Sequence, residues 1–254
     1  MIQHLIDTHF HLDYYKEHQK IYDGINERKQ YTLCMTNSPG VYISCKRIYP
    51  ETKYLKFALG FHPQDVSLKD ADFYDFMQLV NTTNYVGEIG LDYHYNNVDK
   101  NLQRKVFQKQ IELAKKYNKT IVIHSRDAAQ DTLDILKKSS ITNNKVVMHC
   151  YSYSKEMAYE FIKMNIKLGI GGVLTFKNAH KLKDIVEELS LNNFLLETDS
   201  PYLTPEPHRG EKNEPCNVIY VAKKIAELKN LPLDEVLEVT TSNAICQFDL
   251  KLDL

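Results

Sequence analysis

Eight short apolar segments that alternate with longer amphipathic segments predict a single domain, residues 1–254, folded as a closed (β/α)8 barrel of the TIM type. The chain length agrees, because one such barrel takes about 250 residues. A third observation is that ionisable residues stand where several apolar segments stop, as they do at the carboxyl-terminal mouth of a barrel. An open doubly wound sheet is the alternative architecture.

The predicted strands are short, and several are continuously apolar rather than alternating. This pattern is typical of parallel strands that are covered on their outer face. They lie near residues 5–6, 31–35, 54–59, 85–89, 120–123, 145–148, 166–170 and 193–196.

The clearest predicted helix covers residues 100–118. Leu102, Val106 and Leu113 mark one apolar face, whereas Lys, Gln and Glu occupy the other. Further helices are predicted at 131–138, 155–164 and 177–189, and two more at 218–229 and 233–244 complete the outer ring.

The composition limits the classes of function. Hydrophobic residues make up 43% and charged residues 26%, as in ordinary globular proteins. The net charge of −1 gives no overall attraction for nucleic acid or acidic membranes, so any polyanion must bind at a local site.

The lack of a recognisable targeting segment and the pattern of cysteines both indicate the cytoplasm. There is no basic segment followed by a long apolar stretch, and no segment approaches the roughly 18 apolar residues of a membrane span. Five scattered cysteines without a Cys-x-x-Cys pair argue against a disulfide framework or a zinc-thiolate site. We therefore expect a cytoplasmic protein without a membrane partner; the sequence does not indicate an oligomeric state.

Histidines and carboxylates at the ends of the apolar segments form the candidate site. In a barrel all these positions open on one mouth. The spacing of His9 and His11 places both imidazoles on one side of an extended strand. Each residue alone could have a structural role, but that alternative requires the same coincidence on five strands even without His62. The set comprises His9 and His11 after the first segment, His62 after the third, Glu88 within the end of the fourth, His124 after the fifth, His149 after the sixth and Asp199 after the eighth.

These nitrogen and oxygen donors predict a metal centre. Without a thiolate they suit Mg, Mn, Zn or Fe. A single catalytic zinc usually takes three protein ligands, so His9, His11, Glu88, His124, His149 and Asp199 fit two divalent ions bridged by Glu88. Two ions and two carboxylates would leave a charge of about +2, which would attract phosphate.

Seven segments, in order and spread from residue 5 to about residue 246, resemble the TatD-related deoxyribonucleases. They are Asp7-Thr-His-Phe-His-Leu-Asp13, Gly60-Phe-His-Pro63, Val86-Gly-Glu-Ile-Gly-Leu-Asp92, Ile123-His-Ser-Arg-Asp-Ala128, Met148-His-Cys150, Leu196-Glu-Thr-Asp-Ser-Pro-Tyr-Leu-Thr-Pro205 and Arg209-Gly-Glu-Lys-Asn-Glu-Pro215. The resemblance implies a metal-dependent barrel of the amidohydrolase-like superfamily that cleaves DNA.

The resemblance also implies roles for single residues. It assigns the same six metal ligands, and it makes His62, Arg126 and Arg209 candidate phosphate contacts. For Arg126 the alternative is a salt bridge with Asp127 or Asp131, and for Arg209 a solvated loop charge. We expect Mg or Mn at the site, with Zn, Ni or Fe as alternatives, and DNA as the partner, bound as a single strand or a 3′ end.

Asp199 is the candidate for orienting and deprotonating the attacking water, with Glu88 and His62 as the other catalytic residues. The competing function is an amidohydrolase-type hydrolase of a small ester, amide or phosphoester. Such barrels often bridge their metals with a carboxylated lysine, and Glu88 stands in that place here, which favours the nuclease.

Several neighbours have open roles. Asp7 could orient a ligand histidine, and Glu197 could do the same or form a structural ion pair. Tyr153 and Gln64 depart from the family pattern, which bears on substrate preference. Five tyrosines expected near the mouth could stack on bases, with packing as the alternative: Tyr93, Tyr95, Tyr151, Tyr153 and Tyr202.

Overall fold

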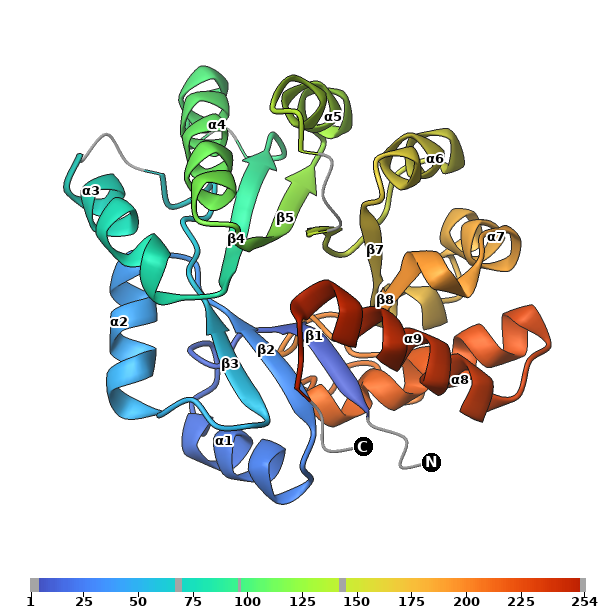
Figure 1. Ribbon diagram of the computed structural model, residues 1–254. Helices are drawn as coiled ribbons and strands as arrows, with labels where there is room; N and C mark the ends of the chain where they lie inside the picture. The colour runs from blue at the N-terminus through green and yellow to red at the C-terminus, as the bar shows by residue number, and fades with distance from the viewer. Residues whose placement is uncertain (1–4, 67–69, 96, 142–144, 252–254) are drawn as a thin grey trace.

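A computed structural model describes residues 5–66, 70–95, 97–141 and 145–251, in which parallel strands form a ring with helices outside it (Figure 1). The prediction of a (β/α)8 barrel is confirmed. The strands are β1 (Ile6–Phe10), β2 (Tyr31–Met35), β3 (Leu55–Ala58), β4 (Tyr85–Asp92), β5 (Thr120–Arg126), β6 (Val146–Met148), β7 (Lys167–Ile170) and β8 (Phe194–Leu196).

Backbone hydrogen bonds close the ring at two seams. Strands β1 to β3 form one sheet and β4 to β8 another. Between β3 and β4, the Leu59 N–H donates to Tyr85 O over 3.0 Å and the Gly87 N–H donates to Leu59 O over 3.0 Å. Between β8 and β1, the Asp199 N–H donates to His9 O over 2.9 Å, and the chain pairs again at Phe10 and Ser200. These bonds exclude the open doubly wound sheet.

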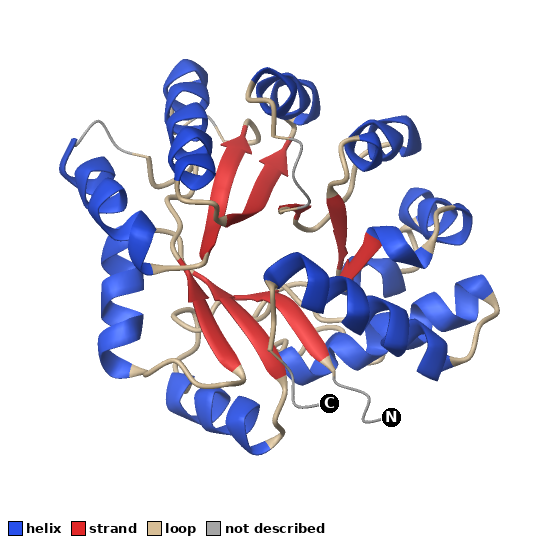
Figure 2. Cartoon of the chain, in the orientation of Figure 1, coloured by secondary structure: helices blue, strands red, loops and turns tan. Residues whose placement is uncertain are grey.

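Helices cover the outside of the ring (Figure 2). They are α1 (His18–Glu27), α2 (Pro39–Ile48), α3 (Asp70–Leu79), α4 (Lys100–Lys116), α5 (Ala129–Lys138), α6 (Lys155–Lys163), α7 (His180–Glu188), α8 (Val218–Lys229) and α9 (Leu233–Phe248). Helices α4 to α9 match the predicted segments within a few residues, whereas the sequence analysis did not identify α1 to α3.

Local signals start several helices. Ser38 accepts from the Val41 N–H over 3.3 Å at the start of α2, and Pro39 follows in the first turn, where its missing N–H needs no partner. Asp99 begins α4 in the same way by accepting from the Leu102 N–H over 3.0 Å. The capping residue and proline of α2 were therefore a readable signal.

Three strands are longer than predicted at their carboxyl ends. Strand β1 reaches Phe10, β4 reaches Asp92 and β5 reaches Arg126. Glu88 therefore lies in the middle of β4, not at its end, and His9 and His124 lie inside strands. The apolar segments stop early because side chains at the mouth of a barrel are polar although their backbones still pair.

The interior of the barrel is filled below the candidate site. Val122, Val147 and Leu195 are buried in one cluster. They lie two residues before His124, His149 and Glu197, within β5 or at the ends of β6 and β8, so each pair shares a face where the backbone stays extended. Phe248 of α9 belongs to this cluster. The carboxyl end of α9 also bonds to the starts of the strands, because the Tyr85 hydroxyl donates to Phe248 O over 2.9 Å.

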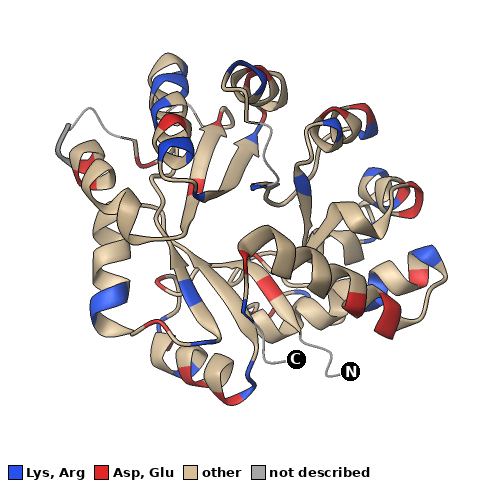
Figure 3. Ribbon diagram, viewed as in Figure 1, with Lys and Arg blue, Asp and Glu red and all other residues tan. Residues whose placement is uncertain are grey.

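Charged residues of both signs are interspersed over the outer helices (Figure 3), in keeping with the small net charge. No helix in the described part of the chain is both long and apolar enough to cross a membrane.

Candidate metal centre

Glu88 lies at the centre of the site, and its two carboxylate oxygens face different histidines. Oε2 lies 3.6 Å from Nε2 of His9 and 3.5 Å from Nε2 of His11. Oε1 lies 2.8 Å from Nδ1 of His124 and 3.6 Å from Nε2 of His149. One buried carboxylate can therefore serve two groups of donors, as a bridging ligand does.

Asp199 completes the group around His9 and His11. Its Oδ1 lies 3.7 Å from Nε2 of His9, 3.6 Å from Nε2 of His11 and 3.8 Å from Nε2 of His149. Asp199 adopts a left-handed backbone conformation, with φ of 53°, three residues after the end of β8, and its N–H donates to His9 O, which holds this segment against β1.

The spacing of these donors fits a divalent ion. Two nitrogens bound to one ion at about 2.1 Å lie roughly 3.0–3.4 Å apart for bond angles between a right angle and a tetrahedral angle. The Nε2 atoms of His9 and His11 are 3.2 Å apart, and both rings are buried. The Nδ1 atoms of both histidines have no hydrogen-bond partner among the described residues. The inward Nε2 atoms are thus the converging donors.

Two further carboxylates lie against the other two histidines. Asp92 Oδ2 lies 3.1 Å from Nε2 of His124, and Glu197 Oε1 lies 3.1 Å from Nδ1 of His149. Each leaves one ring nitrogen facing Glu88. Such outer carboxylates fix the orientation and tautomer of a ligand imidazole. The sequence analysis missed Asp92, although it lies four residues after Glu88, and left the role of Glu197 open.

The role of Asp7 was left open, with orientation of a ligand histidine as one possibility, and its carboxylate binds backbone and hydroxyl groups instead of a histidine ring. It accepts from the backbone N–H of His9 over 3.2 Å and from the backbone N–H and hydroxyl of Thr198 over 2.9 and 2.6 Å. Asp7 therefore ties β1 to the segment before Asp199 and acts on the backbone of the site.

The electrostatics of the metal-free cluster follow from these contacts. Burial opposes protonation of His149, but the carboxylates of Glu197, Asp199 and Glu88 outweigh it and raise its pKa to about 10. Burial likewise opposes protonation of His124, yet hydrogen bonds with Asp92 and Glu88 raise its pKa to about 9. Burial would raise the pKa of Glu88, and the neighbouring histidines hold it well below its usual range instead.

His62 lies beside the cluster in a different protonation state. Its ring packs edge-on against His124 with 4.5 Å between centroids, and burial lowers its pKa to about 3. Its Nδ1 accepts from the Gln64 N–H over 3.2 Å, so the proton of the neutral ring belongs on Nε2. His62 can therefore donate a neutral hydrogen bond. Gln64 supports it through its backbone, whatever its side chain.

Arg126 extends from the end of β5 and is exposed. Its guanidinium lies over the Tyr95 ring, 5.3 Å from the centroid. The alternative prediction, a salt bridge from Arg126 to Asp127 or Asp131, is wrong, because Asp127 pairs with His94 over 3.1 Å and Asp131 pairs with Arg104. Its guanidinium therefore has no competing carboxylate from these two residues.

Arg209 lies in the loop after β8, where its guanidinium packs over the Phe176 ring at 3.8 Å from the centroid. Stacking with a cation holds an exposed arginine in one place. The structure does not bring Arg209 into contact with the six clustered residues.

Cys150 differs from the other cysteines. Its thiol lies within 4.8 Å of donor atoms of His149 and Glu197, and its N–H donates to Glu197 Oε1 over 2.6 Å. Burial raises the pKa of the thiol well above its usual value, so the neutral form, a poor metal ligand, is favoured. All five cysteines are free.

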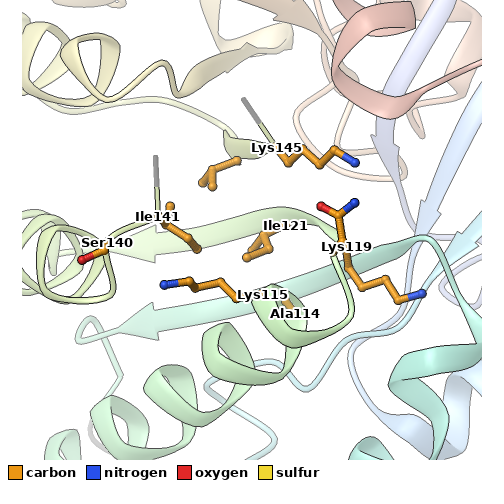
Figure 4. Close-up of a pocket in the computed structure, with 9 residues that line it drawn as sticks. Ala114, Lys115, Lys119, Ile121, Ser140, Ile141 and Lys145 are labelled. Carbon is orange, nitrogen blue, oxygen red and sulfur yellow. The ribbon is translucent and has the colours of Figure 1, made fainter. Parts of the chain in front are cut away.

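A separate cavity of about 90 Å³ lies at the other end of the barrel, near the starts of β5 and β6 (Figure 4). Lys115, Lys119 and Lys145 line it. The Lys115 ammonium already donates to Ser139 O and the Lys119 ammonium to Asn81 O over 3.5 Å. This cavity is remote from the cluster and contains none of its residues.

Comparison with known proteins agrees with this geometry. A family model described as TatD related DNase matches residues 6–249. The metal-dependent hydrolase YabD of Bacillus subtilis is 38% identical over 94% of this chain and 97% of its own length. The metal-dependent hydrolase YcfH of Escherichia coli is 34% identical over 94% of this chain and 93% of its own length.

Solved structures resemble the fold as well. The TatD homologue YjjV of Escherichia coli superposes with a TM-score of 0.90 at 26% identity, covering 99% of this chain and all of that one. A TatD family hydrolase of Entamoeba histolytica gives 0.82 at 19% identity over 99% of this chain and all of its own, which supports the fold alone.

Proposed function

The chain belongs to the TatD-related DNase family of metal-dependent hydrolases, and from that premise we propose that it hydrolyses phosphodiester bonds in DNA. The observation that carries the proposal is the division of the Glu88 carboxylate between two groups of donors. Paired ions suit the displacement at a phosphodiester, where both the attacking and the leaving oxygen need stabilisation.

In this proposal two divalent ions bind per chain. Mg or Mn are favoured, and Zn, Ni or Fe are the alternatives. One ion would be held by His9, His11 and Asp199, whose donor atoms lie within 4.8 Å of one another. The other would be held by His124 and His149, which lie 2.8 and 3.6 Å from Oε1 of Glu88, and Glu88 would be shared. When bound, the ions would supply Lewis acidity and lower the pKa of the attacking water toward about 7.

The charge of the loaded site corrects the expectation of about +2. That figure counted Glu88 and Asp199 only. Asp92 and Glu197 add two negative charges at 3.1 Å from ligand histidines, which brings four carboxylates against two ions, or about zero. The affinity for phosphate would therefore come from direct contacts at short range rather than from a long-range field.

Asp199 is the proposed base. Its side chain is 17% exposed, compared with 4% for Glu88 and 0% for Glu197, so it faces the mouth more than these two. A carboxylate that accepts a proton from water must have access to it. We assign Asp199 to orient the water and take its proton.

His62 and Arg126 are the proposed contacts of the non-bridging phosphate oxygens. The neutral His62 ring would donate a hydrogen bond from Nε2, whereas Arg126 would supply positive charge from the rim. Arg209, held on Phe176 farther along the rim, would contact a phosphate outside the reacting group.

Hydrolysis of an end-labelled single strand tests the proposal. The protein is treated with chelator and then reloaded with Mg, Mn, Zn, Ni or Fe in turn. Bis-p-nitrophenyl phosphate and simple amide and lactone substrates are run in parallel. We expect DNA cleavage that disappears with chelator and returns with Mg or Mn.

A Glu88→Gln variant purified in the same way controls for contaminating nuclease, because it loses the bridging charge. Equal cleavage by wild type and variant would attribute the activity to a contaminant. Hydrolysis of an amide or lactone with DNA left intact would establish the amidohydrolase-type function instead.

A further inference from the structure

Three exposed tyrosines lie at the carboxyl-terminal mouth of the barrel. Tyr14 is 41% exposed in the loop after β1, Tyr95 is 52% exposed after β4, and Tyr202 is 52% exposed after β8. Because parallel strands all end at the same face, these loops border the cluster. Single exposed aromatic side chains are common on protein surfaces, but several that gather around one site indicate a binding surface.

The other tyrosines that the sequence placed near the mouth are occupied by structural contacts. Tyr151 is buried. Tyr93 donates to Asp131 over 2.6 Å, and the Tyr153 hydroxyl bonds to Ser125 over 2.8 Å. These three are therefore part of the fold, and the sequence analysis overlooked Tyr14.

Tyr14 and Tyr202 form a pair, with 5.6 Å between ring centroids and an angle of 61°. The Tyr14 ring lies 5.3 Å from the ring of His11, so the pair borders the cluster directly. Asn37 donates to the Tyr14 hydroxyl over 2.8 Å, and Asn213 donates to Tyr202 O over 2.7 Å. Both residues are held in place while the rings stay accessible.

Tyr95 occupies the opposite side of the mouth. Strands β4 and β5 lie across the ring from β8 and β1 (Figure 1). Arg126 covers the Tyr95 ring at 5.3 Å, and His94 packs edge-on against it at 4.8 Å between centroids. Tyr95, with the Arg126 guanidinium over its ring, therefore lies on the side of the mouth opposite the pair of tyrosines.

We propose that Tyr14 and Tyr202 form one base-stacking platform and Tyr95 with Arg126 a second, so that an unpaired strand crosses the cluster with a base held on each side of the reacting phosphate. This inference rests on the proposed function. Every base has a π-face, so stacking tolerates any sequence. Bases within a duplex are stacked on one another and cannot reach such platforms, which selects unpaired nucleic acid.

Lys212 adds a positive charge beside the first platform. Its ammonium lies 4.6 Å from the centroid of the Tyr15 ring and 3.5 Å from Tyr14 O. A strand whose base rests on Tyr14 would carry its next phosphate within reach of this cation.

Binding measurements test the platforms directly. The probe is a fluorescent single-stranded oligonucleotide with Mg, in an Asp199→Asn background that prevents turnover. Tyr14→Ala, Tyr95→Ala and Tyr202→Ala should each weaken binding roughly tenfold, whereas the matching Phe variants should bind as the parent does. Tyr74→Ala is the matched control, because Tyr74 is 56% exposed on α3, outside the mouth. Unchanged binding in all three alanine variants would overturn the proposal.

Abasic substitutions separate stacking from phosphate contacts. At one position of the strand, removal of the base should weaken binding to the parent roughly tenfold and leave binding to Tyr202→Ala unchanged, because the stack is already lost. Losses that add at every position would overturn the platform.

The two proposals fail in different ways. Base-dependent coupling to the tyrosines, with no DNA cleaved by the wild type under any metal, would remove the proposed function and keep the platforms. Metal-dependent cleavage with alanine variants that bind like the parent would remove the platforms and keep the function.

Discussion

Glu197 and His149 are linked by a contact of 3.1 Å between Oε1 and Nδ1, and a glycine makes room for it. A Cβ atom at Gly169 would lie 2.2 Å from the other carboxylate oxygen of Glu197, closer than any real contact. Strand β7 thus leaves open the space that lets the carboxylate of Glu197 reach the histidine.

Gly169→Ala should displace Glu197 and loosen the orientation of His149. Loss of an outer partner of this kind lowers metal affinity by roughly 10–100-fold. Titration calorimetry of the chelated protein with Mn measures it. Gly171→Ala is the matched control, since its Cβ would meet Glu197 O at an ordinary 3.6 Å. Equal affinity in both variants would contradict the proposed contribution of Glu197.

Asp199→Asn should abolish turnover while DNA binding largely persists. The substitution keeps the size of the side chain but removes the proposed base and one charged ligand. Turnover number and affinity are to be measured at verified metal occupancy, with the exposed Asp234→Asn as control. If the Asp199 variant turns over like wild type, the base is misassigned, and His124 and His149 are to be tested next.

Metal binding should release protons. In the metal-free cluster the pKa values of His149 and His124 are raised to about 10 and about 9, so both rings are protonated at pH 7, and a bound ion must displace those protons. Affinity should therefore increase with pH. Calorimetry in buffers of different ionisation enthalpy counts the protons; a count of zero at pH 7 would exclude protonated ligands.

The stability of the metal-free protein should decrease as the pH rises, whereas its affinity for metal increases. The pKa of His124 rises from 6.5 to about 9 on folding, so its contribution to the free energy of unfolding is complete below pH 6.5 and is lost as pH rises through 9. Chelated protein should thus melt at lower temperature at pH 9 than at pH 6.5. An Asp92→Asn variant, which removes one cause of the shift, should flatten that slope; a slope equal to that of wild type would contradict the assignment.

Arg126→Ala should weaken substrate binding with a smaller effect on turnover. Loss of a charge-assisted hydrogen bond costs about 2 kcal/mol, or roughly 30-fold in affinity. Arg126→Lys keeps the charge but not the planar group that covers Tyr95, so it should recover only part of the affinity. An alanine variant with wild-type affinity would remove Arg126 from the substrate contacts.

The sequence could predict that the site residues lie close together, because in a barrel this depends only on their position at the carboxyl ends of the strands. His124 and His149 are separated in sequence, but each stands at the mouth end of its strand, and parallel strands bring those ends together. The role of Asp92 could not be read in this way. It depends on the distance from its carboxylate to one ring nitrogen of His124, which no periodicity encodes.

The first three helices escaped prediction for a related reason. Helix α1 buries only Ile21 and Ile25, and α2 buries Pro39, Tyr42 and Cys45, so each has few buried residues to mark its inner face in the sequence. Their packing is set by the strands beside them. Seam closure is likewise a tertiary event, carried by single backbone bonds such as the one from Asp199 to His9.

The carboxyl end of α9 has a consequence for the order of folding during synthesis. Gln247 accepts from the Thr120 hydroxyl over 3.2 Å and donates to Val146 O over 3.1 Å, while Phe248 accepts from Tyr85. Partners more than a hundred residues apart cannot meet until the ribosome has released residue 248. The strands that form earlier therefore lack the contacts that close the amino-terminal end of the barrel until the end of α9 has been synthesised.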